Sequence, residues 1–203
     1  MAGVCPYNKR QNRLLHKGYT KLLKLSENPP VVWPKGTSIV DFEGTWWVAH
    51  TKSRNEKALA WQLQKRDIPY FLPMTQKVTR KKGRTFRSLL PLFTGYVFFC
   101  GDENQRLEVL KTNRLANLIE VPDRVKLVAE LKPIERVILQ GKPLCPHKYI
   151  EKGQRCRVIA GPLKDTEGMI VQTPTQTRLI LQVDMLGQAT SVEIDSDMIE
   201  LTG

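Results

Sequence analysis

The stretch Leu90-Pro91-Leu92-Phe93-Thr94-Gly95-Tyr96-Val97-Phe98-Phe99 decides how the rest of the sequence is interpreted. Aromatic and β-branched residues stand on both sides of one glycine, and an apolar run of this composition predicts a buried strand rather than a helix. A glycine inside such a run indicates a bulge or a close approach by another backbone. The chain therefore contains at least one strand that a packed core covers.

The segments around this stretch alternate between strand and helix patterns. We predict a strand at 45–51, a helix at 56–66, an extended segment at 68–73, a hairpin of 74–80 and 84–90, a helix at 104–111, a strand at 115–121 and a helix at 128–139. Gly83 supplies the turn of the hairpin. This order predicts an α+β fold, a ferredoxin-like α/β sandwich with helices on an antiparallel sheet, at residues 45–139.

The two flanks of this domain have a different character. Residues 1–44 form a basic N-terminal extension, expected to be either an amphipathic helix with a basic face or a partly disordered arm. Residues 140–148 contain two prolines and a glycine and are predicted to be the interdomain linker. Residues 149–203 carry short Val/Ile-rich stretches between turn signals, which predicts a small SH3-like β-barrel.

Composition and charge limit the classes of function that this sequence can have. The formal net charge of +12 favours a polyanionic partner, either nucleic acid or an anionic membrane surface, and a merely soluble basic surface is the alternative. None of the four cysteines forms a C-x-x-C pair, and Cys100 and Cys156 are predicted core residues in a reducing compartment. We find no metal pattern, phosphate loop or nucleophilic arrangement, so no enzymatic activity, cofactor or metal is expected. No run is as long as a membrane span and no signal peptide is visible, so a cytoplasmic protein is expected.

Several segments together resemble the NusG family of transcription elongation factors. The aromatic strand matches Trp46-Trp47, the early glutamate of the next helix matches Glu56, and the family's Phe-Pro-Gly-Tyr strand matches Phe93-Thr94-Gly95-Tyr96. The C-terminal segment resembles a KOW domain, with the family's turn pattern at Gly161-Pro-Leu-Lys-Asp-Thr-Glu-Gly168 and a second turn at Leu186-Gly187-Gln188-Ala189-Thr190. Thr94 replaces the family's proline and the N-terminal arm is additional, which suggests a specialised paralogue.

The resemblance implies a non-enzymatic elongation or antitermination factor. The first domain (NGN) would bind the clamp helices of the largest RNA polymerase subunit, and the KOW domain would recruit a ribosomal protein or Rho. The polymerase-binding residues would be Phe93, Thr94, Tyr96 and His50. A core position for one or both of the Phe93 and Tyr96 rings is the alternative, because strand alternation turns neighbouring side chains to opposite faces.

A cluster of cations at the hairpin is the candidate nucleic-acid site. The residues are Arg80, Lys81, Lys82, Arg84 and Arg87, which would lie near DNA in the elongation complex, and a solvated hairpin is the alternative. Gly95, Gly161 and Gly168 are interpreted as structural turns.

Three further expectations follow. The chain is expected to be a monomer whose two domains fold separately, because the linker looks too polar to join them. The KOW segment should form strands rather than helices. A ribosomal or RNA-binding protein remains the alternative function, since KOW domains also occur in ribosomal proteins and the positive charge suits ribosomal RNA.

Overall fold

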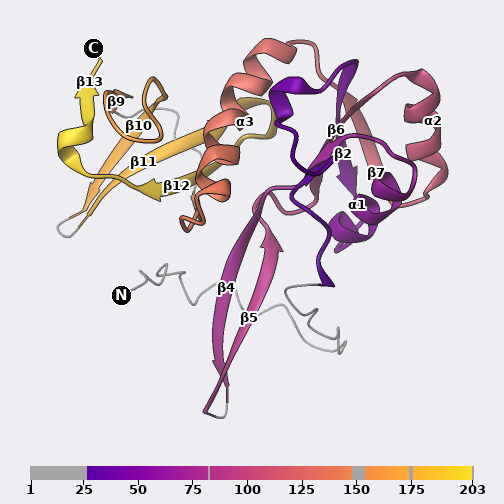
Figure 1. The fold of residues 1–203 in the computed structure, drawn as a ribbon, viewed down its shortest axis with the longest axis horizontal. Helices are drawn as coiled ribbons and strands as arrows, with labels where there is room; N and C mark the ends of the chain where they lie inside the picture. Colours follow the sequence, from indigo (N-terminus) through magenta and orange to yellow (C-terminus); the bar gives the residue numbers. More distant parts are fainter. Residues whose placement is uncertain (1–26, 82, 148–153, 174–175, 203) are drawn as a thin grey trace.

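The computed structural model describes residues 27–81, 83–147, 154–173 and 176–202. The first domain is built on a five-stranded antiparallel sheet in the order β1 (Val32–Trp33), β3 (Tyr70–Phe71), β6 (Tyr96–Gly101), β2 (Thr45–Thr51) and β7 (Leu115–Glu120). Its helices are α1 (Glu56–Lys65), α2 (Glu103–Lys111) and α3 (Arg124–Leu139) (Figure 1). The predicted α+β architecture is confirmed.

Strands β2 and β6 are buried on both faces. Trp47 and Phe99 point toward a core that α1 and α2 share, whereas Val48 and Phe98 point toward the core that contains α3. Successive side chains of a strand face opposite ways, so a strand covered on both sides has no polar face and reads as a continuous apolar run. This explains why 96–101 contains no charged residue, and it confirms the predicted buried strand.

The arm ahead of this sheet is part of the first domain from about residue 32 onward. β1 pairs with β3, and the short 3-10 helix at Ile39–Asp41 buries Ile39 completely. Glu135 of α3 holds this segment, since it accepts hydrogen bonds from Ser38 Oγ (2.7 Å) and from the Ile39 amide (2.9 Å). The domain boundary expected at residue 45 is therefore too late, while the helix expected within 1–26 lies outside the described residues.

Strands β4 (Met74–Lys81) and β5 (Arg84–Pro91) pair with each other and, within the described part of the chain, with no other strand, and they project from the domain as an antiparallel hairpin (Figure 1). Lys81 pairs with Arg84, which leaves a two-residue turn containing Gly83. Gly83 has a φ of +72°, so the predicted hairpin and its turn residue are confirmed.

The C-terminal part is β-rich, as the Val/Ile content predicts. Its antiparallel sheet has the order β13 (Ile199–Leu201), β9 (Gln154–Val158), β10 (Glu167–Thr173), β11 (Gln176–Val183), β12 (Gln188–Glu193) and β8 (Cys145–His147). Two short 3-10 helices, Asp184–Leu186 and Ser196–Met198, connect its strands. Gly161 lies in a turn with a φ of +77°. Gly168 instead lies within β10, where a Cβ atom would come within 2.7 Å of the Ile180 carbonyl oxygen, so close strand approach rather than a turn requires glycine there.

The segment 140–148 is more than a linker. Its residues Cys145–His147 form β8, which pairs with β12, and Leu144 is buried. Thr75 Oγ donates a hydrogen bond of 2.6 Å to the Leu144 carbonyl and so ties this segment to the base of the hairpin. The expectation that 140–148 is too polar to join the domains is wrong, because its apolar residues enter the core.

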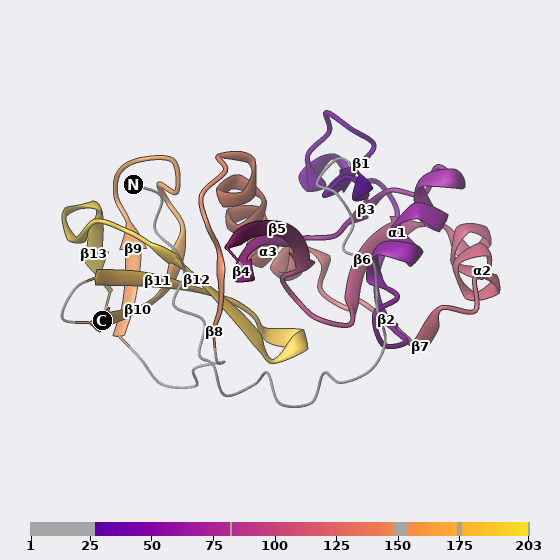
Figure 2. The same ribbon diagram turned by 90° about the horizontal axis from the view of Figure 1, so that it is seen from below.

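Helix α3 lies between the two sheets (Figures 1 and 2). One buried cluster runs from Leu131 and Ile134 of α3 into Leu181 and Val183 of β11. At the polar edge of this contact, Lys126 Nζ lies 2.7 Å from the Asp184 carboxylate. The Asp184 amide donates a hydrogen bond of 3.2 Å to the Glu130 carboxylate. The two domains therefore share a core. None of the described helices has both the length and the apolar character that crossing a membrane requires.

Candidate functional site

The turn that leads into β6 is clamped from two sides. The Gly95 carbonyl accepts a hydrogen bond from the Thr51 amide at 2.8 Å, and the Gly95 amide donates to Glu56 Oε1 at 2.7 Å. Gly95 has a φ of +87°, a region that side chains with a Cβ seldom adopt. Glu56 stands at the first position of α1 and is only 5% exposed, so its carboxylate acts as an anchor between helix and turn.

This clamp fixes an aromatic pair at the surface. His50 of β2 and Tyr96 of β6 are cross-strand partners, and their rings stack with centroids 4.9 Å apart and planes 19° apart. Asn117 of β7 pairs with His50 on its other side. All three residues are partly exposed or exposed, and they form a row across three strands.

The row lies at one end of the sheet face that α3 covers. His50 follows Val48 by two residues along β2, and Tyr96 precedes Phe98 by two along β6, so alternation turns all four side chains to the same face. Val48 and Phe98 are fully buried, whereas His50 and Tyr96 are only half-buried. The α3 core therefore ends at this aromatic pair, and its edge is open to solvent.

Phe93 does not belong to the exposed surface. Its side chain is 1% exposed and meets the Phe98 ring edge-on, with centroids 6.1 Å apart and planes at 86°. The expectation of an exposed ring at Phe93 is wrong, and the alternative of a core position holds there. The reason is the turn itself: the Tyr96 amide donates to the Phe93 carbonyl at 3.1 Å, so strand alternation cannot be extended from Tyr96 back to Phe93. Thr94 lies at the tip of this turn and is exposed.

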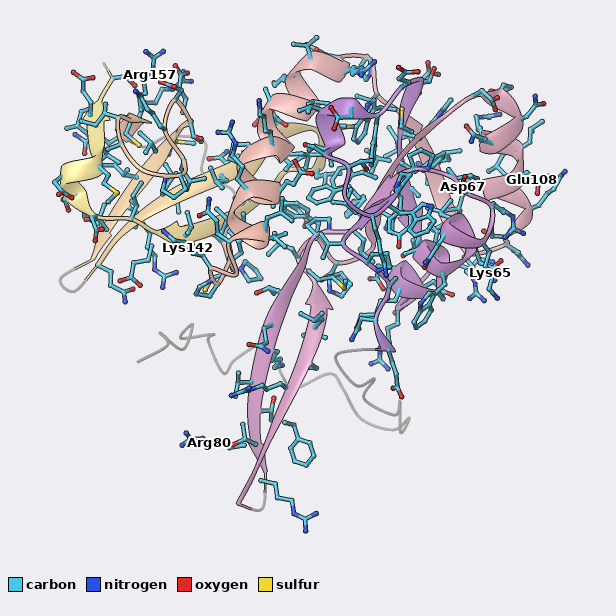
Figure 3. The ribbon with its side chains drawn as sticks, in the orientation of Figure 1. Lys65, Asp67, Arg80, Glu108, Lys142 and Arg157 are labelled. Atoms are coloured by element: carbon cyan, nitrogen blue, oxygen red, sulfur yellow. The ribbon has the colours of Figure 1, made fainter. Side chains whose placement is uncertain are left out.

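The structure divides the hairpin cations between two faces. Directly opposed residues of an antiparallel pair share a face. Val78 pairs with Arg87 and Arg80 with Thr85, which places both of these arginines on one face. Thr79 pairs with Phe86, which places Phe86 and its neighbour Arg84 on the other. The three arginines are exposed, and Figure 3 shows Arg80 extending outward from β4.

The remaining two predicted cations are only partly defined. Lys81 pairs with Arg84 through the backbone at the end of β4, and Lys82 lies outside the described residues. The hairpin therefore presents two different basic faces rather than the single cluster that the sequence suggested.

Sequence reasoning missed two contributors to these surfaces. Glu56 was noted only as a family match, although its carboxylate sets the position of Gly95. The sequence analysis assigns no role to Phe86, although this aromatic residue lies within the basic segment and is 42% exposed. An aromatic residue within a segment composed mainly of basic and polar residues was the available signal.

The first domain is similar to a known protein family. Residues 44–137 match the family model described as "Transcription termination factor nusG". A solved structure described as "Domain interaction in Thermotoga maritima NusG" is 19% identical with a TM-score of 0.49, over 78% of this chain and 97% of that one. A structure described as "Crystal Structure of MjSpt4:Spt5 complex conformation B" is 16% identical with a TM-score of 0.25, again over 78% and 97% of the two chains. The first domain, at residues 44–137, is therefore a domain of the NusG family of transcription factors.

Proposed function

We propose that this protein is a transcription elongation or antitermination factor that binds the clamp helices of RNA polymerase through the surface formed by His50, Thr94 and Tyr96. The C-terminal KOW domain recruits a second partner, either a ribosomal protein or Rho. Phe93 supports this surface from beneath and does not touch the polymerase.

The observation that carries the proposal is the stacked His50–Tyr96 pair at the open edge of the α3 core. Aromatic side chains that are already held in place lose little conformational entropy on binding, and they dominate the affinity of protein interfaces. The Glu56–Gly95 hydrogen bond fixes the backbone next to the pair. An apolar helix surface of the partner would cover the rings and complete their burial.

The hairpin supplies a second contact. Residues 74–91 carry six basic residues and no acidic one: Lys77, Arg80, Lys81, Lys82, Arg84 and Arg87. Within the described part of the chain, Arg80, Arg84 and Arg87 take part in no ion pair or side-chain hydrogen bond. These cations would bind the phosphates of DNA in the elongation complex, since phosphate contacts need only charge and reach.

The experiment measures binding of the full chain to purified RNA polymerase. Tyr96→Ala should weaken binding about 30-fold or more, which corresponds to the roughly 2 kcal/mol of an interface hot spot. Val125→Ala is the control, because Val125 is 81% exposed and lies outside the proposed surface. Equal affinity of the folded Tyr96→Ala protein and the wild type would refute the polymerase surface.

A ribosomal or RNA-binding role is the alternative that the charge of +12 supports. Purification of the protein with its partners from a native extract, with and without nuclease, distinguishes the two. Polymerase should remain bound after nuclease treatment, whereas recovery of ribosomal subunits without polymerase would favour the alternative.

A further inference from the structure

The two faces of the β4–β5 hairpin differ in what accompanies their arginines. One face carries Arg80 and Arg87 with Val78, which is 41% exposed. The other carries Arg84 with Phe86, which is 42% exposed. The hairpin thus offers an aliphatic and an aromatic side chain of matched exposure on opposite sides of the same ribbon.

The Phe86 ring has no structural role in the core. Among the residues that the structure describes, the ring belongs to neither buried cluster and the hairpin pairs with no other strand. Contacts to phosphate would need the arginines alone, so charge does not explain an exposed aromatic ring at this position.

Stacking on a nucleobase explains an exposed aromatic ring at this position. Every base has a π-face, and proteins that bind single strands combine basic grooves with aromatic side chains on which bases stack. In a duplex the bases already stack on each other and present only their edges in the grooves. A ring beside an arginine therefore suits an unpaired base and its phosphate.

We propose that the Phe86 face of the hairpin binds single-stranded nucleic acid, with an unpaired base stacked on the Phe86 ring and Arg84 on a neighbouring phosphate. Arg84 and Phe86 are two residues apart on one face of β5, about 7 Å along the strand, which is within reach of one nucleotide. This inference rests on the proposed nucleic-acid contact of the hairpin and specifies its ligand.

The test is fluorescence anisotropy with the full chain and three labelled probes. These are a thymidine strand of about 12 nucleotides, the same strand with abasic sites, and a duplex of equal length. Phe86→Ala should weaken binding to the thymidine strand about 5- to 150-fold. Val78→Ala, the matched control on the opposite face, should bind as the wild type does.

The other arms separate stacking from charge. On the abasic strand, Phe86→Ala should bind as tightly as the wild type, because no base remains to stack. The salt dependence of Phe86→Ala should keep the wild-type slope, whereas Arg84→Gln should flatten it by about 0.7 for one lost contact to a single strand. Phe86→Leu keeps an apolar side chain in the hairpin and should lose affinity as the alanine variant does.

Three results would overturn the inference: equal affinities of the Phe86→Ala and Val78→Ala proteins, tighter binding of the wild type to the duplex than to the single strand, or an undiminished effect of Phe86→Ala on the abasic strand. Joint replacement of Arg80, Arg84 and Arg87 by glutamine tests the proposed nucleic-acid contact itself. If that variant binds as tightly as the wild type, the proposed nucleic-acid contact of the hairpin is refuted. If it binds weakly while Phe86→Ala does not, only the stacking inference fails.

Discussion

Replacement of Phe93 by alanine should damage folding rather than the polymerase surface. The ring is 1% exposed and meets Phe98 edge-on within the core that α3 covers. Truncation of a buried phenylalanine to alanine costs about 3–5 kcal/mol, and an edge-to-face pair accounts for about 0.5–1.5 kcal/mol of aromatic interaction. Since domains of this size are stable by only about 5–15 kcal/mol, the variant should lose about a fifth or more of its stability.

The assay is equilibrium unfolding in urea, followed by tryptophan fluorescence. Trp46 of β2 belongs to the same buried cluster as Phe93, so its emission reports on this core. Phe93→Leu is the control variant, because leucine keeps most of the apolar volume and should destabilise less. Under conditions in which the leucine variant is folded, its affinity for polymerase should equal that of the wild type.

Two outcomes would contradict this reasoning. A folding free energy of Phe93→Ala within about 1 kcal/mol of the wild type would mean that the ring is not part of the core. A folded Phe93→Leu protein with the same loss of polymerase affinity as Tyr96→Ala would mean that Phe93 contacts the partner directly.

Two further predictions concern the clamp and the contact between the domains. Glu56→Ala leaves the Gly95 amide without its acceptor and should cost about 1–3 kcal/mol in urea unfolding, whereas Glu56→Gln keeps an acceptor oxygen and should cost less. Burial, and secondly the nearby Asp184 carboxylate, raises the pKa of Glu130. The neutral Glu130 carboxyl therefore favours the folded protein: its contribution is complete below the ordinary glutamate pKa of about 4.3 and is lost as the pH rises through the higher pKa of the folded state. Glu130→Gln should flatten this part of the dependence of unfolding free energy on pH, and an unchanged dependence would exclude Glu130 as its source.

The sequence predicts best where one local rule acts alone. The run from Tyr96 to Cys100 can only be a strand covered on both sides, and Gly83 between two alternating segments can only be a hairpin turn. Cys100 and Cys156 are buried free thiols, as predicted, and burial raises the pKa of both, to about 11 for Cys100. Each of these features depends on residues that are neighbours in the chain or on burial alone.

The errors arose where contacts outside the alternating strand pattern decide the outcome. The side on which Phe93 lies depends on a turn closed by a hydrogen bond from Tyr96, and alternation offers no warning of it. The arm belongs to the first domain because Glu135, almost a hundred residues later, accepts its hydrogen bonds. Leu144 is buried although prolines and a glycine surround it. In each case the deciding partner cannot be identified from local periodicity.

Helix α3 carried a signal of the shared core that could have been used. A surface helix has one apolar stripe, whereas a helix buried on several sides is apolar around much of its circumference. In α3, Leu127, Leu131 and Ile134 are buried together with Val137, and Val128 and Ile138 also pack against the core. At about 3.6 residues per turn, these positions cover about half of the helix circumference, which is wider than a stripe of about 100°. A helix with that pattern beside a linker needs a second element to cover it, and here β11 of the C-terminal domain does so. The contact of the two domains is therefore encoded in α3 itself, and the polar residues of 140–148 are a poor guide to it.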